Sequence, residues 1–431
     1  MYKYMIRTGF LVTLACVALI VSSCNSAPPT PQAPQANDDR FEMRTGATLD
    51  VPGPGLLAND VGESMTVTSV NGVTANVGLP TATAESGTLT VQTNGALHYV
   101  PAGGFKGTDT FSYGVSNPGG EDDANASVLV TDPWTPLAAI PTPVSRAAGV
   151  FWDGRFYVIG GEAAGGARDG LVQVYDPATD EWTVLPDTMV TGVANHCAVV
   201  LGDAVYVPGG YTGTVGVSST QVLDLVNGTW SVDTAAELPE TRYAHSCTTM
   251  SGKIYLFGGG ATGDASDTVW LYEPSLPAGS RWVTTLATMP STIAYSASVT
   301  VGERIFVAGF SSPATGAGND SDAVWEYTPG TDAWRTYPSL LTARGAAGMW
   351  TDGVTLFVGG GGWSTPLATV EAYDLSQGTG GTWITSDPMV DVRRTYAYAS
   401  DPATGYLYAA SGWGGTTYRG GSEVGRLLTI P

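Results

Sequence analysis

The sequence predicts an all-β protein in which a small β-sandwich precedes a six-bladed β-propeller. Three observations support this fold class. Of the 431 residues, 57 are glycine and 27 proline while 13% are charged, a composition typical of turn-rich β-proteins. Short alternating runs of apolar and polar residues fill residues 38–131, and tryptophans recur at nearly constant spacing beyond residue 131.

Residues 1–23 are predicted to be a signal peptide for export. Lys3 and Arg7 precede an apolar run, residues 10–21, that is too short and too close to the start for an ordinary spanning helix. The Val-Ser-Ser-Cys sequence that ends at Cys24 resembles the lipobox of bacterial lipoproteins, which implies lipidation of Cys24 and anchoring in the cell envelope. Asn25 stands where an inner-membrane lipoprotein often has Asp, which favours the outer membrane or cell surface. A signal peptide without lipidation and a short membrane anchor are the alternatives.

The next two segments are predicted to be a spacer and a sandwich domain. Residues 24–37 are polar and proline-rich with nothing to bury, so we expect a linker. Residues 38–131 contain alternating runs such as 87–95 and 96–101, separated by turn residues. The placement of strand and turn residues in this segment resembles that of the cadherin-like and immunoglobulin-like modules of bacterial surface proteins. That resemblance implies possible calcium binding, with turn and capping roles as the alternative. The implied ligands are Asp38, Asp39, Asn59, Asp60 and Asp109.

One signature recurs through residues 132–431 with a period near fifty. Between tryptophans come an aromatic-led strand that ends in glycine and then a valine-led strand. These units resemble kelch repeats, and four short strands per unit form a propeller blade. The tryptophans are Trp134, Trp182, Trp230, Trp282, Trp334 and Trp383, at intervals of 48, 48, 52, 52 and 49 residues. The aromatic-led strands contain Tyr157, Tyr206, Tyr255, Phe306, Phe357 and Tyr408, and the valine-led strands contain Val172, Val222, Val269, Val324, Val370 and Val424.

Counting residues predicts how the propeller closes. From Trp383 to Pro431 is 48 residues, so the chain stops where a seventh tryptophan would fall. We expect residues 134–137 to supply the missing fourth strand of the last blade, which removes an exposed sheet edge. Blade four, with Phe310 after its glycine, and blade six, with Ser411 before its glycine, depart from the repeat.

Charge restricts the possible partners. The chain carries 39 acidic and 18 basic residues, a net charge of -21, which excludes nucleic acid as a favoured partner. Arginines nevertheless recur near the start of the innermost strands, and the symmetry of the fold predicts that they surround one mouth of the central channel. There they would bind carboxylates or other anions, unless they form ion pairs between blades. They are Arg146, Arg242, Arg344, Arg393 and Arg394.

Histidines and cysteines occupy the same part of the repeat. His196 and His245 share one repeat position, where they either bind a ligand or metal or simply fill the channel wall. Cys197 and Cys247 lie at nearly the same place in successive repeats and are either disulfide-bonded or free buried thiols. Some kelch-like propellers are copper radical oxidases, and that resemblance would involve His245, Cys247 and Tyr243.

The leading functional hypothesis is a surface-anchored binding or adhesion protein that engages a protein or a glycan. Tyr211, Trp363 and Trp413 follow the glycine pairs and could stack on sugar rings or side chains. The alternative is a carbohydrate-active enzyme resembling the six-bladed kelch mutarotases of sialic acid, with Glu240 and Arg242 in proton transfer. An envelope assembly factor is a third possibility. Apart from calcium in the sandwich domain, no cofactor is expected.

Overall fold

The chain divides into two compact units. The computed structural model describes residues 31–262, 265–311 and 319–425. One unit comprises Met1–Phe41 and Gly46–Leu129, and the other comprises Glu42–Thr45 and Val130–Pro431. The predicted signal peptide and Cys24 lie outside the described residues. Within those residues, none of the helices has the length and apolar character needed to cross a bilayer. These helices are short 3-10 turns: η1 (Gly55–Leu57), η2 (Thr74–Asn76), η3 (Ala164–Gly166), η4 (Thr234–Ala236) and η5 (Leu375–Gly380).

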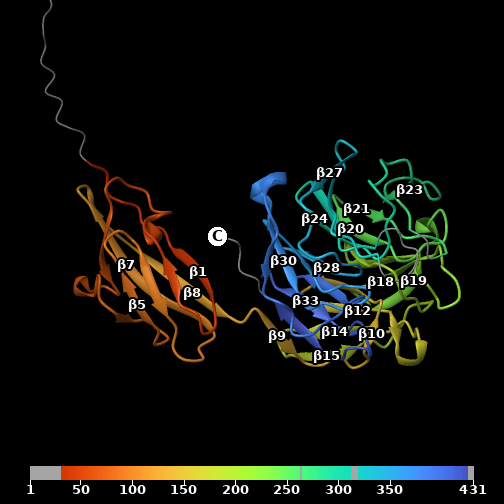
Figure 1. Ribbon diagram of the computed structural model, residues 1–431, viewed down its shortest axis with the longest axis horizontal. Helices are drawn as coiled ribbons and strands as arrows, with labels where there is room; N and C mark the ends of the chain where they lie inside the picture. Colours follow the sequence, from red (N-terminus) through yellow and green to blue (C-terminus); the bar gives the residue numbers. More distant parts are fainter. Residues whose placement is uncertain (1–30, 263–264, 312–318, 426–431) are drawn as a thin grey trace, which may run out of the picture. The chain divides into compact units, whose positions relative to one another are not determined.

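The first unit is a β-sandwich of two four-stranded sheets (Figure 1). Side chains alternate between buried and exposed along its strands, as in Leu97–Val100, which is the pattern of a sheet with one face in a core. One sheet has the order β1 (Asp39–Arg44), β8 (Gly120–Thr131), β7 (Gly107–Asn117), β3 (Thr66–Val70). The other has the order β2 (Leu49–Val51), β6 (Leu97–Val100), β5 (Thr88–Val91), β4 (Thr81–Ala82).

The end of the expected spacer packs on this sandwich. Pro34 is buried, and Gln35 pairs with Val61 through two backbone hydrogen bonds of 2.8 and 2.9 Å. The Ala36 N–H donates to the Asp122 carboxylate at 2.8 Å. Residues 34–37 therefore belong to the packed domain, because their backbone groups find partners that the polar composition of the segment does not reveal.

The second unit contains six four-stranded antiparallel sheets within the described residues, the six blades of a propeller (Figure 1). Blade one is β11 (Ala148–Trp152), β12 (Arg155–Ile159), β14 (Val172–Asp176) and β15 (Glu181–Val184). Blade two is β16 (Val199–Leu201), β17 (Ala204–Pro208), β18 (Thr220–Asp224) and β19 (Thr229–Val232). Blade three is β20 (Ser246–Met250), β21 (Lys253–Phe257), β22 (Val269–Tyr272) and β23 (Trp282–Val283).

The remaining blades follow the same order from the axis outward. Blade four is β24 (Ala297–Val301), β25 (Arg304–Ala308), β26 (Val324–Thr328) and β27 (Ala333–Tyr337). Blade five is β28 (Gly348–Thr351), β29 (Thr355–Gly359), β30 (Val370–Asp374) and β31 (Ile384–Ser386). Blade six is β32 (Ala397–Ser400), β33 (Leu407–Ala410), β34 (Ser422–Gly425) and β9 (Trp134–Leu137). A small ladder, β10 (Val144–Ser145) with β13 (Glu162–Ala163), joins blade one at its inner end.

The aromatic-led and valine-led runs are the second and third strands of each blade. Both faces of these strands are covered by neighbouring blades, so β29 is buried at every residue and β25 at four of five. This two-sided burial explains why they are continuously apolar rather than alternating. The outermost strands, such as β15, are largely exposed.

Five of the six periodic tryptophans tie the outer strand of a blade to the loop that enters the same blade. The Trp182 indole N–H donates to the Ala138 carbonyl oxygen at 2.8 Å, and Trp334 donates to that of Ala287 at 3.0 Å. Trp134, Trp282 and Trp383 make equivalent bonds. The indole N–H of Trp230 has no such partner. The spacing near fifty thus reflects one indole hydrogen bond per blade in five of the six blades.

The propeller closes with strands from both sides of the repeat array, as the sequence predicts. Strand β9 pairs antiparallel with β34, with Thr135 opposite Val424. The innermost strands contact one another in a continuous circle, β11–β16–β20–β24–β28–β32–β11. Strand β9 therefore covers the edge of β34, and blade six has four strands like the other blades.

A second ring, made of backbone hydrogen bonds, lies at one end of the channel. In each blade a residue shortly before the innermost strand, two positions before it in five blades and four in blade two, has a left-handed backbone with φ between 48° and 59°. Its N–H donates to the carbonyl oxygen of the equivalent residue in the preceding blade at 2.6–3.0 Å. We call these the ring residues, and the end of the channel where they lie the ring mouth. They are Arg146, Asn195, Ala244, Tyr295, Ala346 and Thr395.

Blades four and six accommodate their departures from the repeat. In blade four Phe310 is fully buried and packs against Trp325 at 4.7 Å between ring centroids. In blade six Ser411 takes the left-handed conformation that glycine adopts elsewhere, with φ of 62°, and its hydroxyl donates to the Val144 carbonyl oxygen at 2.6 Å. The side-chain hydrogen bond to blade one therefore stabilises a left-handed backbone conformation that glycine adopts without strain.

Candidate functional site

A cavity of about 850 Å³ occupies the centre of the propeller. The innermost strands of all six blades line it, and the ring residues surround one of its ends. Its volume is in the range of small-molecule sites, and its wall near the ring mouth is mostly small or hydroxyl-bearing side chains. The chemistry of the site therefore depends on the few charged and aromatic groups at the ring mouth.

Arg146 is the charged ring residue. Its guanidinium lies 3.2 Å from Glu162, and the same carboxylate also pairs with Arg168 and accepts a hydrogen bond of 2.8 Å from the Tyr418 hydroxyl. The Arg146 side chain remains 30% exposed. One carboxylate thus serves two guanidinium groups, which leaves positive charge at the mouth.

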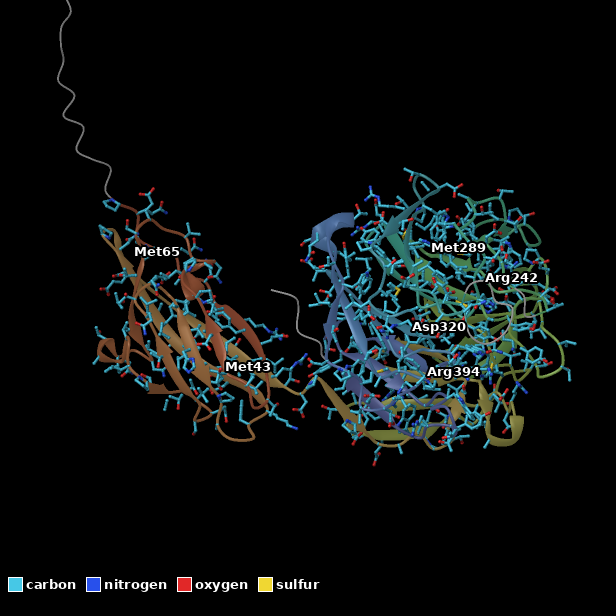
Figure 2. The ribbon with its side chains drawn as sticks, viewed as in Figure 1. Met43, Met65, Arg242, Met289, Asp320 and Arg394 are labelled. Carbon is cyan, nitrogen blue, oxygen red and sulfur yellow. A yellow bond between two sulfur atoms is a disulfide. The ribbon has the colours of Figure 1, made fainter. Side chains whose placement is uncertain are left out.

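Arg394 brings a second guanidinium to the same mouth. It lies over the Trp363 ring at 4.5 Å, and Trp363 in turn packs against the ring residue Tyr295 at 4.6 Å. Burial and the nearby charge of Arg146 lower the pKa of Arg394, while the carboxylate of Asp320, on the same part of the propeller (Figure 2), opposes that effect. Asp320 itself is held by backbone N–H groups, including that of Trp363 at 2.9 Å. Two like charges are therefore held within electrostatic reach of each other.

The expectation of one arginine ring around the mouth is wrong for three of its five members. Arg242, Arg344 and Arg393 stand two residues before the ring position and are at most 2% exposed. Arg344 pairs with buried Glu371 at 2.5 Å, and Arg393 with buried Glu423 at 2.6 Å. Because they lie inside their blades, they are unavailable to a ligand. Only Arg146 and Arg394 of the set reach the ring mouth.

The proposed proton-transfer pair does not face the cavity. Arg242 is stacked on Trp270 at 3.6 Å, donates to the Gly258 carbonyl oxygen at 2.9 Å, and is labelled in Figure 2. Glu240 lies 2.8 Å from it and its side chain is 56% exposed. Neither residue is among the described residues that line the cavity. Arg242 is fixed by packing and hydrogen bonds, so this geometry gives no support to a catalytic role.

The two histidines link neighbouring blades. The Nε2 atoms of His196 and His245 donate to the carbonyl oxygens of Ile159 and Pro208 in the preceding blades, each at 3.1 Å. Burial lowers the pKa of His196 to about 4, and burial together with Arg242 lowers that of His245 to about 3. Both imidazoles are neutral at pH 7 with one nitrogen already engaged. In the described residues no group of three or more His, Cys, Asp or Glu side chains could hold a metal.

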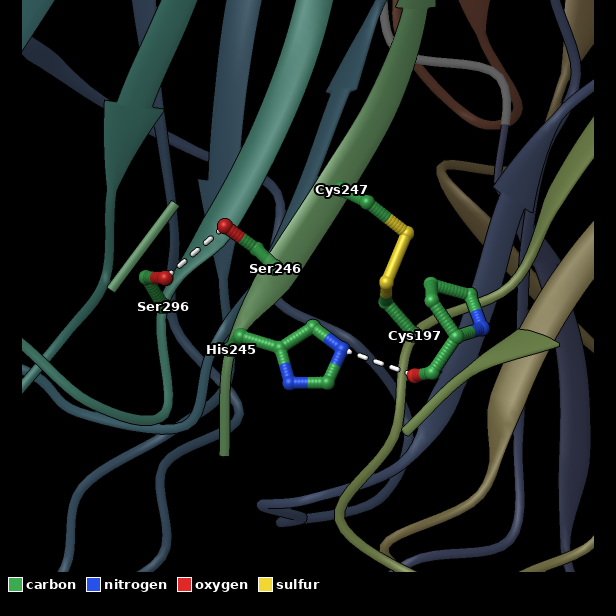
Figure 3. Close-up of a disulfide and its surroundings, with 6 residues drawn as sticks. Cys197, His245, Ser246, Cys247 and Ser296 are labelled. Carbon is green, nitrogen blue, oxygen red and sulfur yellow. Dashed lines mark hydrogen bonds between the residues drawn. A yellow bond between two sulfur atoms is a disulfide. The ribbon is translucent and has the colours of Figure 1, made fainter. Parts of the chain in front are cut away.

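The two cysteines form a disulfide between blades two and three (Figure 3). Their Cα atoms are 5.8 Å apart. Cys197 stands two residues after ring residue Asn195, whereas Cys247 stands three residues after Ala244, so the bond joins positions offset by one residue. His245 and Ser246, next to Cys247, hydrogen-bond to Pro208 and Ser296. Of the two states that the sequence leaves open, the structure contains the bonded one.

The expected calcium ligands separate into two groups. The Asn59 side-chain amide donates to the Asp38 carbonyl oxygen, while Asn37 donates its backbone N–H to the Asp60 carboxylate and its side-chain amide to the Asn59 carbonyl oxygen. Asp39 lies beside them, and burial with the charges of Asp60 and Asp38 raises its pKa to about 6. Asp109 is apart from these contacts: its carboxylate accepts hydrogen bonds from the hydroxyls of Thr83 and Tyr99 and from the N–H groups of Glu85 and Thr110. Asp109 therefore acts as an internal anchor.

The aromatic candidates lie around the ring mouth, half-buried in pairs. Tyr211 packs on Tyr243 at 4.9 Å, and Trp413 packs on Tyr418 at 5.2 Å. The sequence analysis did not single out Glu162, which pairs with Arg146, or Tyr295 and Asp320, which lie near Arg394 without an ion pair to it. The repeat itself contained a signal for Tyr295, because it aligns with Arg146 and Asn195.

Comparison with known proteins identifies both units. The family described as the KLHDC2/KLHL20/DRC7 Kelch-repeats domain matches residues 124–259 and 195–391, and the bacterial Ig domain family matches residues 31–131. Kelch-like protein terF of Aspergillus terreus is 29% identical over 249 residues, covering 54% of this chain and 53% of that protein. Kelch-like protein 35 of Mus musculus is 31% identical over 144 residues, 33% of this chain and 23% of that protein. Alpha-scruin of Limulus polyphemus is 26% identical over 224 residues, 48% and 24% of the two chains. The chain thus spans about half or less of these relatives.

Proposed function

Because the chain belongs to the kelch-repeat family, we propose that it is a protein-binding module whose partner docks on the ring mouth of the propeller. The observation that carries this proposal is a pair of guanidiniums at the ring mouth: Arg146 lines the cavity, and Arg394, which does not line it, lies over Trp363 next to ring residue Tyr295. Arg146 shares its only carboxylate with Arg168, and Arg394 has no carboxylate within ion-pair distance among the described residues. A partner that places a carboxylate between the two guanidiniums would supply the missing charge.

Apolar side chains around the same mouth support protein docking. The loop that enters each blade carries one exposed apolar residue directly after a buried one. Three of these are Val190, Leu341 and Val390, each between 56% and 59% exposed. The others are the exposed prolines Pro141, Pro239 and Pro290. A charged centre with apolar surroundings is the arrangement in which a protein anchor excludes water.

Location and tethering are a further part of the proposal. The signal-like N-terminus and the lipobox-like sequence at Cys24 support export and lipid anchoring at the envelope, with the Ig-like domain carrying the propeller away from the membrane. Adhesion through the ring mouth follows from this arrangement.

Peptide display on the full chain tests the docking proposal. Selected peptides are expected to be rich in Asp or Glu, and Arg146→Gln or Arg394→Gln should each weaken their binding roughly tenfold, the loss of one charged hydrogen bond. Arg155→Gln is the matched control, because Arg155 makes one exposed ion pair with Asp176 at the ends of β12 and β14 that lie away from the ring mouth.

Two results would overturn the proposal. One is unchanged affinity of the selected peptides for both mouth variants. The other is binding on a glycan array with no peptide selected, which would assign the ring mouth to sugars through Tyr211, Trp363 and Trp413.

A further inference from the structure

The interblade disulfide lies on the wall of the central cavity. Both Cys197 and Cys247 line the cavity of about 850 Å³, Cys197 being partly exposed and Cys247 9% exposed. They come two and three residues after ring residues, so they lie near the ring mouth rather than at the far end of the innermost strands. A small molecule in the mouth end of the cavity is therefore next to the sulfur–sulfur bond.

The propeller does not need this bond to close. Ring closure rests on the pairing of β9 with β34 and on the six backbone hydrogen bonds of the ring residues. In the described part of the chain, blades two and three are joined by cysteines and the other blade boundaries are held by packing and hydrogen bonds alone. We therefore expect the propeller to stay closed when the disulfide opens, which would make reversible chemistry at this position compatible with the fold.

The cavity also selects by size and charge. Its volume is that of a site for molecules of a few hundred daltons, which suits a small thiol better than a cysteine carried on a folded protein. Arg146 is the one Lys or Arg among the described residues that line it, and it lies at the ring mouth. Asp352 and Asp401 line the cavity at the opposite ends of the innermost strands. An anion is thus attracted at the mouth where the disulfide lies and repelled at the other.

We propose that the Cys197–Cys247 bond is a thiol-exchange site for small anionic thiols. A thiolate sulfur attacks one cysteine sulfur, the disulfide bond breaks, and its electron pair leaves on the other cysteine as a thiolate. The protein then carries the small thiol as a mixed disulfide. A second thiolate attacks the small thiol's sulfur, releasing the symmetric small disulfide and leaving both cysteines reduced. This site does not depend on the protein partner proposed above.

Reduction kinetics of the full chain test the proposal. Loss of the disulfide is followed by alkylation and mass spectrometry with mercaptoacetate, 2-mercaptoethanol and cysteamine at equal thiolate concentrations, and with a thioredoxin-type protein. Each rate is divided by that of the same thiol with a small linear disulfide, because thiolates of different pKa differ in intrinsic nucleophilicity. At low salt this ratio is expected to be at least about fivefold higher for the anionic thiol than for the cationic one, and the protein dithiol is expected to react no faster than the chain unfolds. Arg146→Gln should remove the charge preference, whereas Arg155→Gln should keep it.

The Cys247→Ser variant gives a second readout. Its remaining Cys197 is expected to form a stable mixed disulfide, seen as a mass increase, when exposed to the symmetric disulfide of mercaptoacetate. The inference is overturned if small thiols reduce the bond only after unfolding, if the protein dithiol reacts as fast as 2-mercaptoethanol, or if reaction rates do not depend on thiol charge. Failure to bind acidic peptides would leave these rates unchanged, so the two proposals fail separately.

Discussion

The backbone N–H of Arg146 donates to the carbonyl oxygen of Thr395 at 2.6 Å, and this bond joins the first blade to the sixth. The hydroxyls of Ser145 and Thr395 meet at 2.6 Å beside it. The circle of ring residues is thus complete at the junction where the chain leaves and enters the propeller. Closure there is noncovalent, and it depends on a strand that precedes the first repeat.

Deleting the closing strand is expected to abolish the stable monomeric propeller. A chain beginning after Leu137 lacks β9, which exposes the edge of β34 and removes the buried Trp134. Size-exclusion chromatography and thermal unfolding should show aggregation and a broad transition. A chain that begins at Pro133 retains β9 and is the control. Identical behaviour of the two chains would contradict this account of closure.

The left-handed ring position should reject β-branched side chains. Ala244 has φ of 59° and is 3% exposed. Ala244→Val is expected to destabilise the propeller by about 1–3 kcal/mol because of backbone strain, whereas Ala244→Gly should change stability by less than about 1 kcal/mol. Denaturant unfolding of both variants measures the difference. A valine variant as stable as the glycine variant would show that the strain is relieved elsewhere.

Breaking a buried ion pair should cost far more than breaking an exposed one. Arg393→Met leaves the Glu423 carboxylate, 1% exposed, without its cation and is expected to lower the free energy of unfolding by about 3–5 kcal/mol. Arg155→Met, which breaks the exposed pair with Asp176, should cost less than about 1 kcal/mol. Adding Glu423→Gln to Arg393→Met should recover part of the loss. Equal effects of the two single variants would refute the idea that the buried ion pair contributes more to stability than the exposed one.

Neutral buried histidines predict acid sensitivity. The pKa of His196 falls to about 4 and that of His245 to about 3, from ordinary values near 6.5, because burial penalises the charged form. The unfolded chain therefore takes up these protons first, so the stabilisation is complete above about pH 6.5 and is lost as pH falls toward 4. For His196 the loss is about 3 kcal/mol.

Glutamine substitutions test this pH dependence. His196→Gln and His245→Gln can still donate to the interblade carbonyls but carry no titrating group, so unfolding curves between pH 6.5 and 4 should become flatter. His98→Gln, a change at an exposed residue of the sandwich domain, is the control. An unchanged slope in both propeller variants would mean that other groups govern acid unfolding.

Removing the disulfide is expected to destabilise the propeller without opening it. The bond closes a loop with a sequence separation of 50 residues, for which chain entropy gives a stabilisation of about 4 kcal/mol. The double variant Cys197→Ser with Cys247→Ser should unfold at a lower denaturant concentration, with a free energy of unfolding lower by about that amount. It should also remain monomeric. If it aggregated like the chain that lacks β9, the bond would be part of ring closure.

The repeat made most of the propeller predictable. The tryptophan spacing is visible because one indole per blade bonds to the same loop in five blades, and the buried second and third strands appear as continuous apolar runs. The pairing of residues 134–137 with the last blade is confirmed, since it follows from the count of strands. Backbone partners such as those of Gln35 and Ala36 leave no trace in composition, so the predicted spacer extended too far.

The site was harder to predict because its chemistry depends on offsets of one or two residues. Arg242 and Arg146 look equivalent in the sequence, yet the first stands two residues before the ring position and is buried, while the second occupies the ring position and faces the cavity. Cys197 and Cys247 differ by one residue in the same way. The left-handed conformation that defines the position is adopted by Arg, Ala, Tyr and Thr as well as Asn, so residue type does not reveal it.

The order of strands in blade six has a mechanical consequence. The polypeptide that precedes the propeller runs directly into β9, the four-residue strand that completes the circle. Tension applied through the polypeptide that enters at β9 is delivered to the β9–β34 ladder and the indole of Trp134. One short ladder therefore lies directly in the path of that force, whatever the strength of the other five blades.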